Sequence, residues 1–184
     1  MTATTQSTEK YAIDSAHSSA DFVVRHMVIA KVRGRFGKLT GTIDVPAGAE
    51  VPTSATAEID VNSIDTREEQ RDGHLKSADF LEADKYPTIT FVSTGTEGNG
   101  PSFTLKGMLS IHGVTREVAI AAEYEGRGKD PWGNERIGYS GHVTINRKDY
   151  GLTWNQALET GGVLVGDEVR IEITVEAIKQ QASA

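Results

Sequence analysis

The stretch VLVGDEVRIEITV, residues 163–175, decides the fold class of this 184-residue chain. Apolar side chains stand at every second position from Val163 to Val175, with Asp167 as the polar residue on that side, and the residues on the opposite side from Glu168 onward are charged or polar. Because successive side chains of a β-strand point to opposite faces, this spacing predicts a long strand with one buried and one solvated face. A helix would repeat its apolar residues every three or four positions.

The same period of two recurs along most of the chain. We expect seven further strands at about residues 22–26, 32–45, 55–61, 89–91, 103–111, 118–124 and 137–145, separated by turn sequences. About eight strands with one apolar face each must hide that face in a sandwich or in a closed barrel, and the pattern leaves both open. Gly41, Gly107 and Gly141 fall on strand faces, where they indicate tight curvature or a close approach of chain segments.

One segment near the middle departs from the strand pattern. The run DTREEQRD, residues 65–72, predicts a helix with Asp65 as its N-cap and acidic side chains in its first turn. Residues 77–81 are expected to form a second short turn. The sequence therefore predicts one helical insertion, around residues 66–83, in an otherwise all-β domain.

Composition excludes several classes of protein. The chain has 19 basic and 26 acidic residues and a net charge of −7, which argues against binding to a nucleic-acid backbone. It has no cysteine, so disulfides, thiolate nucleophiles and cysteine-based metal sites are excluded. A filled core of this size would leave roughly 8,600 Å² of surface exposed.

The two ends of the chain are polar. They predict tails at residues 1–10 and 179–184 around a single domain of residues 11–178. No apolar run is long enough for a transmembrane segment. The start of the sequence lacks the cationic and apolar regions of a secretory signal, which favours a cytoplasmic protein.

The histidines give little sign of catalysis. The five of them show no metal-ligand spacing, so we expect no metal site, and no nucleophile motif is present. His26 shares an apolar face with Phe22 and Val24, which fits either a hydrogen-bonded core residue or a polar point in a ligand cavity. His112 and the glycine after it are typical of a hairpin turn.

Arg147 and Asp149 lie two residues apart at the end of a predicted strand. This spacing favours a structural role, as an ion pair or as a clamp on the following turn, over contact with a ligand.

Nine segments together resemble the YceI-like family, the lipocalin-like polyisoprenoid-binding proteins. The segments include Phe22-x-Val24-x-His26-Met27, Tyr86-Pro87-x-Ile89-x-Phe91 and Asn146-Arg147-x-Asp149-x-Gly151. The others are residues 14–18, 34–41, 63–66, 71–80, 107–115 and the strand 163–175. Each segment is weak alone, but their order and combination are specific and extend over residues 11 to about 178.

The resemblance implies an all-β fold, an eight-stranded antiparallel lipocalin-like barrel with a short helical insertion around residues 66–83. It implies no uniform enzymatic activity and no cofactor, but a long apolar cavity for a polyisoprenoid or similar long-chain lipid, such as an isoprenoid quinone. Many family members carry a signal peptide and are periplasmic, and this chain departs from them there.

On that reading, alternate apolar residues form the wall of the cavity. The residues expected there are Phe22, Val24, Phe36, Ile59, Phe91, Leu105, Leu109, Ile120, Tyr139 and Val143. A polar head group would lie at the mouth of the barrel, within reach of His26, His112, Arg147 or Trp154.

Two other functions are compatible with the sequence. An isomerase or hydrolase acting on an apolar substrate would need a His–Asp pair inside a wet cavity. An interaction protein would show an exposed apolar patch and no cavity. Homodimerisation through the C-terminal strand or the helical insertion is compatible with each of them.

Overall fold

A computed structural model describes residues 6–182. The outer parts of the two predicted tails, residues 1–5 and 183–184, lie outside the described residues. The inner part of the N-terminal tail is not a tail, because strand β1 (Thr8–Ile13) begins before Tyr11. Glu9 and Lys10 pair with Val45 and Asp44 of strand β4. Because Glu9 and Lys10 are charged, this part of the strand does not show the apolar alternation from which the other strands were predicted.

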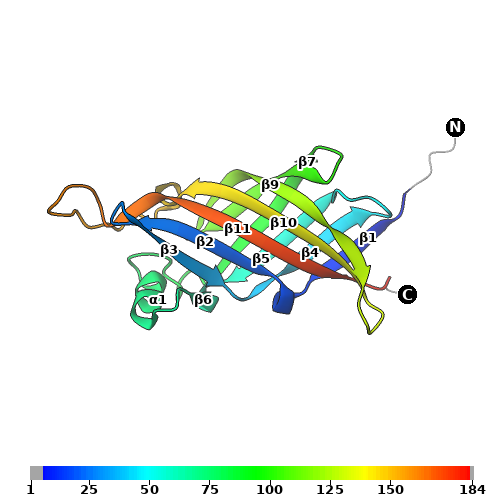
Figure 1. Cartoon of the computed structure of the whole chain (residues 1–184), viewed down its shortest axis with the longest axis horizontal. Helices are drawn as coiled ribbons and strands as arrows, with labels where there is room; N and C mark the ends of the chain where they lie inside the picture. The colour runs from blue at the N-terminus through cyan, green and yellow to red at the C-terminus, as the bar shows by residue number, and fades with distance from the viewer. Residues whose placement is uncertain (1–5, 183–184) are drawn as a thin grey trace.

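The chain folds into a closed antiparallel barrel with one α-helix (Figure 1). The further strands are β2 (Ser19–His26), β3 (Ala30–Phe36), β4 (Leu39–Pro46), β5 (Ser54–Asp60), β6 (Ile64–Asp65), β7 (Thr88–Glu97), β8 (Ser102–Ile111), β9 (Val114–Lys129), β10 (Glu135–Asn146) and β11 (Val165–Lys179). The order β1-β4-β5-β7-β8-β9-β10-β11 returns to β1, because Tyr11 pairs with Lys179 and Ile13 with Ala177. The prediction of an eight-stranded antiparallel barrel is confirmed, and the sandwich is excluded.

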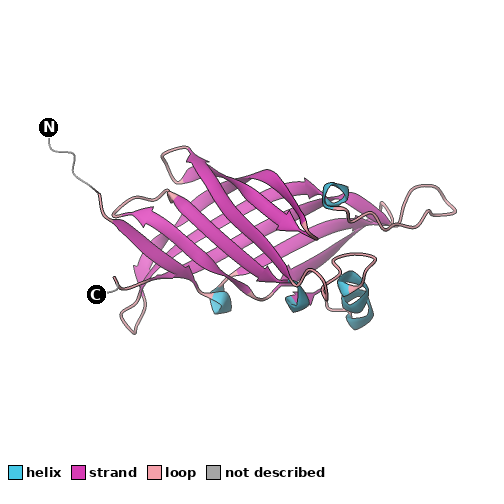
Figure 2. Cartoon of the chain, turned by 180° about the vertical axis from the view of Figure 1, so that it is seen from behind, coloured by secondary structure: helices cyan, strands magenta, loops and turns pink. Residues whose placement is uncertain are grey.

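The three remaining strands continue three of the eight around a bend. A 3-10 turn, η1 (Ser15–His17), separates β1 from β2, and both flanking strands pair with β11. In the same way β3 leads into β4, and η2 (Val61–Ser63) separates β5 from β6. Where β3 runs beyond its short pairing with β6, the helical insertion lies beside it (Figures 1 and 2).

Alternation along the strands matches the prediction. Val169, Ile171 and Ile173 of β11 face the interior, whereas Glu168, Arg170 and Glu172 are exposed. Strand β11 begins at Val165, because Val163 forms an isolated bridge with Ala157 in the preceding loop. The prediction that this strand starts at Val163 is therefore wrong by two residues.

The glycines on strand faces mark close approaches, as expected. A Cβ atom on Gly107 would lie 2.4 Å from the Phe91 ring, and one on Gly41, whose φ is 150°, would lie 2.0 Å from the Thr56 carbonyl oxygen. Gly107 therefore gives an aromatic ring of the wall room to lie against the neighbouring strand.

Helix α1 (Glu69–Lys76) starts later than predicted. Its N-cap is Glu68, whose carboxylate accepts bonds from the backbone N–H groups of Gln70 and Arg71. Asp65 belongs instead to β6 and accepts a bond from the backbone of Arg67, whose φ of 63° is incompatible with a helix. Residues 77–86 form turns rather than further helix. Within residues 6–182, no helix has the length and apolarity that crossing a membrane requires.

The barrel is elongated (Figure 1), and it encloses a cavity. The chain exposes 10770 Å² of surface, about a quarter more than a filled globule of its mass would. Part of this surface lines the interior of the barrel, where side chains face an open space instead of packing against one another.

Candidate functional site

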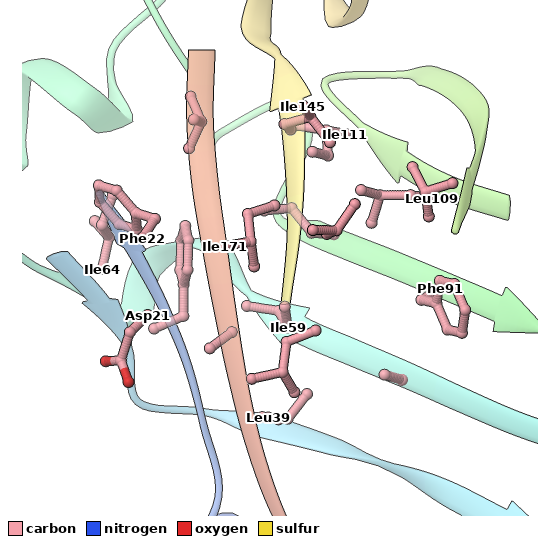
Figure 3. Close-up of a pocket in the computed structure, with 18 of the residues that line it drawn as sticks. Asp21, Phe22, Leu39, Ile59, Ile64, Phe91, Leu109, Ile111, Ile145 and Ile171 are labelled. Carbon is pink, nitrogen blue, oxygen red and sulfur yellow. The ribbon is translucent and has the colours of Figure 1, made fainter. Parts of the chain in front are cut away.

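The interior of the barrel is a cavity of about 640 Å³. Side chains from β2, β3, β4, β5, β7, β8, β9, β10 and β11 contribute to its lining, and most of them are aliphatic or aromatic. Figure 3 shows Leu39, Ile59 and Ile171 among the apolar side chains grouped there, with the Asp21 carboxylate pointing away from them. This volume is within the range of pockets that bind small organic molecules.

All ten residues predicted for the wall line this cavity. They are Phe22, Val24, Phe36, Ile59, Phe91, Leu105, Leu109, Ile120, Tyr139 and Val143. Several of them, such as Leu105 and Val143, are only half-buried because they face the interior space. Their position is thus established, and their contact with a ligand stays a prediction.

The end of the cavity near the chain termini is covered by the loop of residues 47–53. Pro52 of this loop lines the cavity together with Phe103 and Tyr139. The Tyr139 hydroxyl donates to the Glu50 carbonyl oxygen at 2.8 Å, and Arg127 donates to that of Ala49. Burial raises the pKa of Tyr139, so this hydroxyl remains a donor at neutral pH.

The opposite end is organised by Arg147, which is 3% exposed. Its guanidinium donates to the carbonyl oxygens of Leu152 (2.7 Å), Trp154 (2.9 Å) and Gly166 (2.9 Å), and lies 3.7 Å from Asp167. Burial lowers the pKa of the guanidinium, and the Asp167 carboxylate opposes that shift.

Arg147 therefore has a structural role, as the sequence predicted: it holds the turn that follows it. Its carboxylate neighbour is Asp167 of β11, and Asp149 is not its partner. The N–H groups of Arg147 that hold the loop are not free to bind a head group, although part of the Arg147 side chain lines the cavity.

Three rings form an aromatic cluster on the cavity wall at this end. His74 of α1 lies 5.0 Å from Phe80 and 4.7 Å from Trp154, and Phe80 lies 5.2 Å from Trp154, measured between ring centroids. All three line the cavity, so the helical insertion and the loop after η3 (Arg147–Tyr150) meet at its mouth. His74 Nε2 is also 2.9 Å from the Asp79 carboxylate.

The structure separates the histidines into two groups. His26 and His74 line the cavity, whereas His17, His112 and His142 do not. His26 is half-buried at the end of β2, and no hydrogen bond of its ring is found among residues 6–182. The sequence left His26 as either a hydrogen-bonded core residue or a polar group of the cavity, and the structure favours the second.

His112 does not line the cavity, although it was expected to lie within reach of a head group at the mouth. It occupies a hairpin turn between β8 and β9, with φ values of 53° for His112 and 74° for Gly113. Its ring packs 4.8 Å from that of Tyr86, with Nδ1 3.2 Å from the Tyr150 carbonyl oxygen and Nε2 3.4 Å from the Glu82 carboxylate. The turn geometry directs the ring to these neighbours.

Sequence reasoning missed the contribution of the insertion. Gln70, Arg71, Leu75 and Phe80 all line the mouth end of the cavity. The Arg71 guanidinium donates to the hydroxyl and to the carbonyl oxygen of Thr66, which fixes its side chain. Helix α1 has only one large apolar residue, so periodicity could not show that it faces the cavity.

Asp14, His17 and Glu176 form a cluster whose ligand atoms lie within 4.8 Å of one another. Arg136 donates to both carboxylates, at 2.8 Å to Asp14 and 2.6 Å to Glu176. The guanidinium thus supplies the positive charge that a metal ion would bring.

The family profile described as the YceI-like domain matches residues 11–177. The chain belongs to the YceI-like family. It is 38% identical over 167 residues to a UPF0312 protein of Staphylococcus aureus, covering 90% of this chain and 95% of that protein. A UPF0312 protein of Vibrio cholerae is 39% identical over 146 residues, covering 77% of each.

Three solved structures have the same fold. BcnA of Burkholderia cenocepacia gives a TM-score of 0.76 at 25% identity, covering 89% of this chain and 98% of that one. The YceI protein of Campylobacter jejuni gives 0.73 at 30% identity, covering 85% and 90%. A polyisoprenoid-binding domain from Saccharophagus degradans gives 0.71 at 18% identity, covering 92% and 98%, and this likeness concerns the fold alone.

Proposed function

We propose that this protein binds the tail of a long-chain apolar lipid, of the polyisoprenoid or isoprenoid-quinone class, in the lumen of the barrel. The observation that carries the proposal is the cavity of about 640 Å³ with its largely apolar lining. Each square ångström of apolar surface that the tail and the wall remove from water contributes about 25 cal/mol. The polyisoprenoid-binding description of the Saccharophagus degradans neighbour supports this choice of tail.

The distribution of polar groups supports one orientation of the ligand. The polar side chains His26, Gln70, Arg71 and His74 line the mouth end, and the loop of residues 47–53 covers the other end. A polar head group therefore belongs at the mouth and the tail toward Tyr139. Burying the head group at the other end would cost free energy, because few partners are available there.

The proposal is tested by adding bulk to the lumen. Val143 faces the cavity, and its neighbour Thr144, of similar shape, is exposed on the same strand. We expect Val143→Trp to weaken binding of a polyisoprenoid at least tenfold, about 1.4 kcal/mol, and Thr144→Trp to leave it within about twofold. Titration with a fluorescent polyisoprenoid and mass spectrometry of lipids extracted from the purified protein provide the measurements.

Equal affinities of the two variants would contradict the proposal, as would purified protein that neither retains nor binds any long-chain lipid. Thermal unfolding of both variants checks that they are folded. An isoprenoid series of increasing length then measures how much tail the cavity holds.

A second candidate, an isomerase or hydrolase, is favoured by one observation. His74 lines the cavity and contacts Asp79 at 2.9 Å, which is the His–Asp pair that such an enzyme needs. Against it, Asp79 is exposed, and the binding proposal needs no chemical step. NMR and mass spectra of the lipid before and after incubation separate the two candidates. A hydrolase would change the mass of the lipid and an isomerase its NMR spectrum, and His74→Gln would abolish either change, whereas a binding protein would return the lipid unaltered.

A further inference from the structure

The mouth end of the barrel carries large exposed apolar side chains at its tip. The turn between β2 and β3 consists of Met27, Val28 and Ile29, which are 42%, 60% and 85% exposed. Val163, on the neighbouring loop, is 42% exposed. We refer to residues 27–29 and 157–163 as the apolar tip.

The two segments of the tip are joined. The Met27 backbone N–H donates to the Leu164 carbonyl oxygen at 2.8 Å, and a Cβ atom on Gly162 would lie 3.3 Å from the Val28 side chain. In Figure 1 the blue turn lies beside the base of the orange loop, which extends further, and both are at the end opposite the chain termini. They form one protrusion instead of scattered exposed residues.

The backbone holds the tip in an unfavourable conformation. Met27 has a φ of 51° and Val28 a φ of 66°, a region that a β-branched residue rarely adopts. Asn or Gly would relieve this strain, and neither would present an apolar side chain to the outside. Strain kept together with apolar exposure points to a role outside the folded core.

The segment that carries the turn is basic, although the chain as a whole is acidic. Residues 22–43 contain five Lys and Arg and no Asp or Glu, whereas the whole chain has a net charge of −7. Arg35 and Lys38 pair with Asp21 and Asp60. Arg25, Lys31 and Arg33, nearest to the tip, form no ion pair among residues 6–182.

Three carboxylates are also near the tip, on the other segment. Glu159 in the loop and Glu168 near the start of β11 are exposed. The third, Asp167, lies 3.1 Å from Lys148 Nζ and 3.7 Å from the Arg147 guanidinium, so its charge is paired. Positive charge therefore gathers on the β2–β3 side.

The tip is continuous with the mouth of the cavity. His26 directly precedes the turn, Leu164 and Val165 directly follow the loop, and all three line the cavity. The tip therefore borders the lumen at this end.

We propose that the apolar tip inserts into the interfacial region of an anionic lipid bilayer, with Arg25, Lys31 and Arg33 against the head groups and the cavity mouth facing the membrane. Apolar insertion supported by basic residues is the general basis of such binding. The proposal extends the proposed function, because a lipid could then pass between bilayer and lumen without crossing water.

The test measures binding of the full-length protein to vesicles by co-sedimentation. The vesicles consist of phosphatidylcholine alone or mixed with phosphatidylglycerol, and contain no isoprenoid. We expect binding to the anionic vesicles, at least about tenfold weaker in the double variant Val28→Asn, Ile29→Ser. Lys31→Glu combined with Arg33→Glu should remove the preference for anionic vesicles. Asn suits the positive φ, so the first variant should melt no lower than the wild type.

Trp132 provides the matched control. It is 82% exposed, more than Val28, but lies on the β9–β10 hairpin at the opposite end of the barrel. Trp132→Ser should therefore leave vesicle binding unchanged. An equal loss in Trp132→Ser and in the tip variant would overturn the proposal, as would wild-type protein that binds neither kind of vesicle.

Size-exclusion chromatography tests the alternative that the apolar tip binds a second copy of this chain. A wild-type dimer that the tip variant dissolves, without vesicle binding, would assign the tip to dimerisation and overturn the membrane proposal. Vesicle binding without any lipid in the lumen would instead leave this proposal intact and contradict the proposed function.

Discussion

The two ends of the barrel are built from different interactions. At the end near the termini, Arg136 joins the carboxylates of Asp14, Asp130 and Glu176, and a loop anchored by Tyr139 covers the lumen. At the mouth, one buried arginine holds backbone carbonyls and rings from two separate segments meet. Ion pairs that include strand residues thus stabilise the end that the loop covers, whereas a buried arginine and aromatic contacts organise the other.

The closed end is expected to be the more rigid of the two, and the mouth the one through which a ligand enters. Strands β1, β10 and β11 meet at the closed end, so its ion pairs connect elements that the sheet already holds in place. The mouth is formed by α1, the β2–β3 turn and residues 152–164, which have fewer sheet hydrogen bonds. Segments of this kind open at lower free-energy cost than sheet strands do.

The largest expected effect comes from removing the arginine at the mouth. Arg147→Met leaves buried carbonyl oxygens without donors, so we expect the free energy of unfolding to fall by about 3–5 kcal/mol. Lys148→Met is the control, because Lys148 also pairs with Asp167, at 3.1 Å, but is exposed, and should cost less than about 1 kcal/mol. Urea denaturation measures both. Similar losses in the two variants would show that the mouth does not depend on this clamp.

A smaller, pH-dependent effect is expected at the closed end. The hydrogen bond from Arg136, with a further one from His17, lowers the pKa of Asp14 to about 2. A lowered folded-state pKa stabilises the protein above the unfolded value of about 4, and that contribution is lost as the pH falls toward 2. Arg136→Met should therefore lower the melting temperature most above pH 4, with a difference that shrinks toward pH 2.

Arg170→Met is the control for this pH series, since Arg170 makes a single exposed pair with Glu172. Its effect should be small at every pH. A destabilisation by Arg136→Met that is constant from pH 6 to pH 2 would argue against the Asp14 pair as its source.

The smallest expected effect is a shift of tryptophan fluorescence, which compares the two ends of the barrel directly. The two tryptophans report on opposite ends, with Trp154 at the mouth and Trp132 beyond the closed end. In Trp132→Phe, which keeps Trp154, we expect a bound polyisoprenoid to shift the fluorescence emission. In Trp154→Phe, which keeps Trp132, the emission should stay unchanged. A shift of Trp132 emission alone would place the ligand at the wrong end.

The parts of the fold that the sequence predicted are those with a regular strand pattern. Residues 103–111, 118–124 and 137–145 alternate cleanly and lie in β8, β9 and β10, and their inward side chains form the wall. The bend at η1 has no buried residue, and in β1 only Tyr11 and Ile13 are large apolar side chains that face inward, which is too short a pattern to predict a strand. The sandwich was rejected only by the pairing of β1 with β11, which no local spacing reveals.

The mouth was predicted less well than the wall. His112 belongs to a family motif, but its positive φ turns it toward Tyr86 and Glu82, away from the lumen. Leu75 in α1 and Phe80 in the turn after it reach the cavity because of the direction of the insertion, which depends on tertiary contacts. Met27, Val28 and Ile29 are apolar, so nothing in the sequence indicated that they would be exposed, and only the structure shows the tip.

The seam between β1 and β11 also affects how the barrel is made. It joins Tyr11 to Lys179, so the ring cannot close until nearly the whole chain has left the ribosome. Contacts between such distant residues make folding slow, in the range of milliseconds to seconds for small β-proteins. Until then the apolar wall faces the solvent, and the nascent chain is open to aggregation or to chaperones for that period.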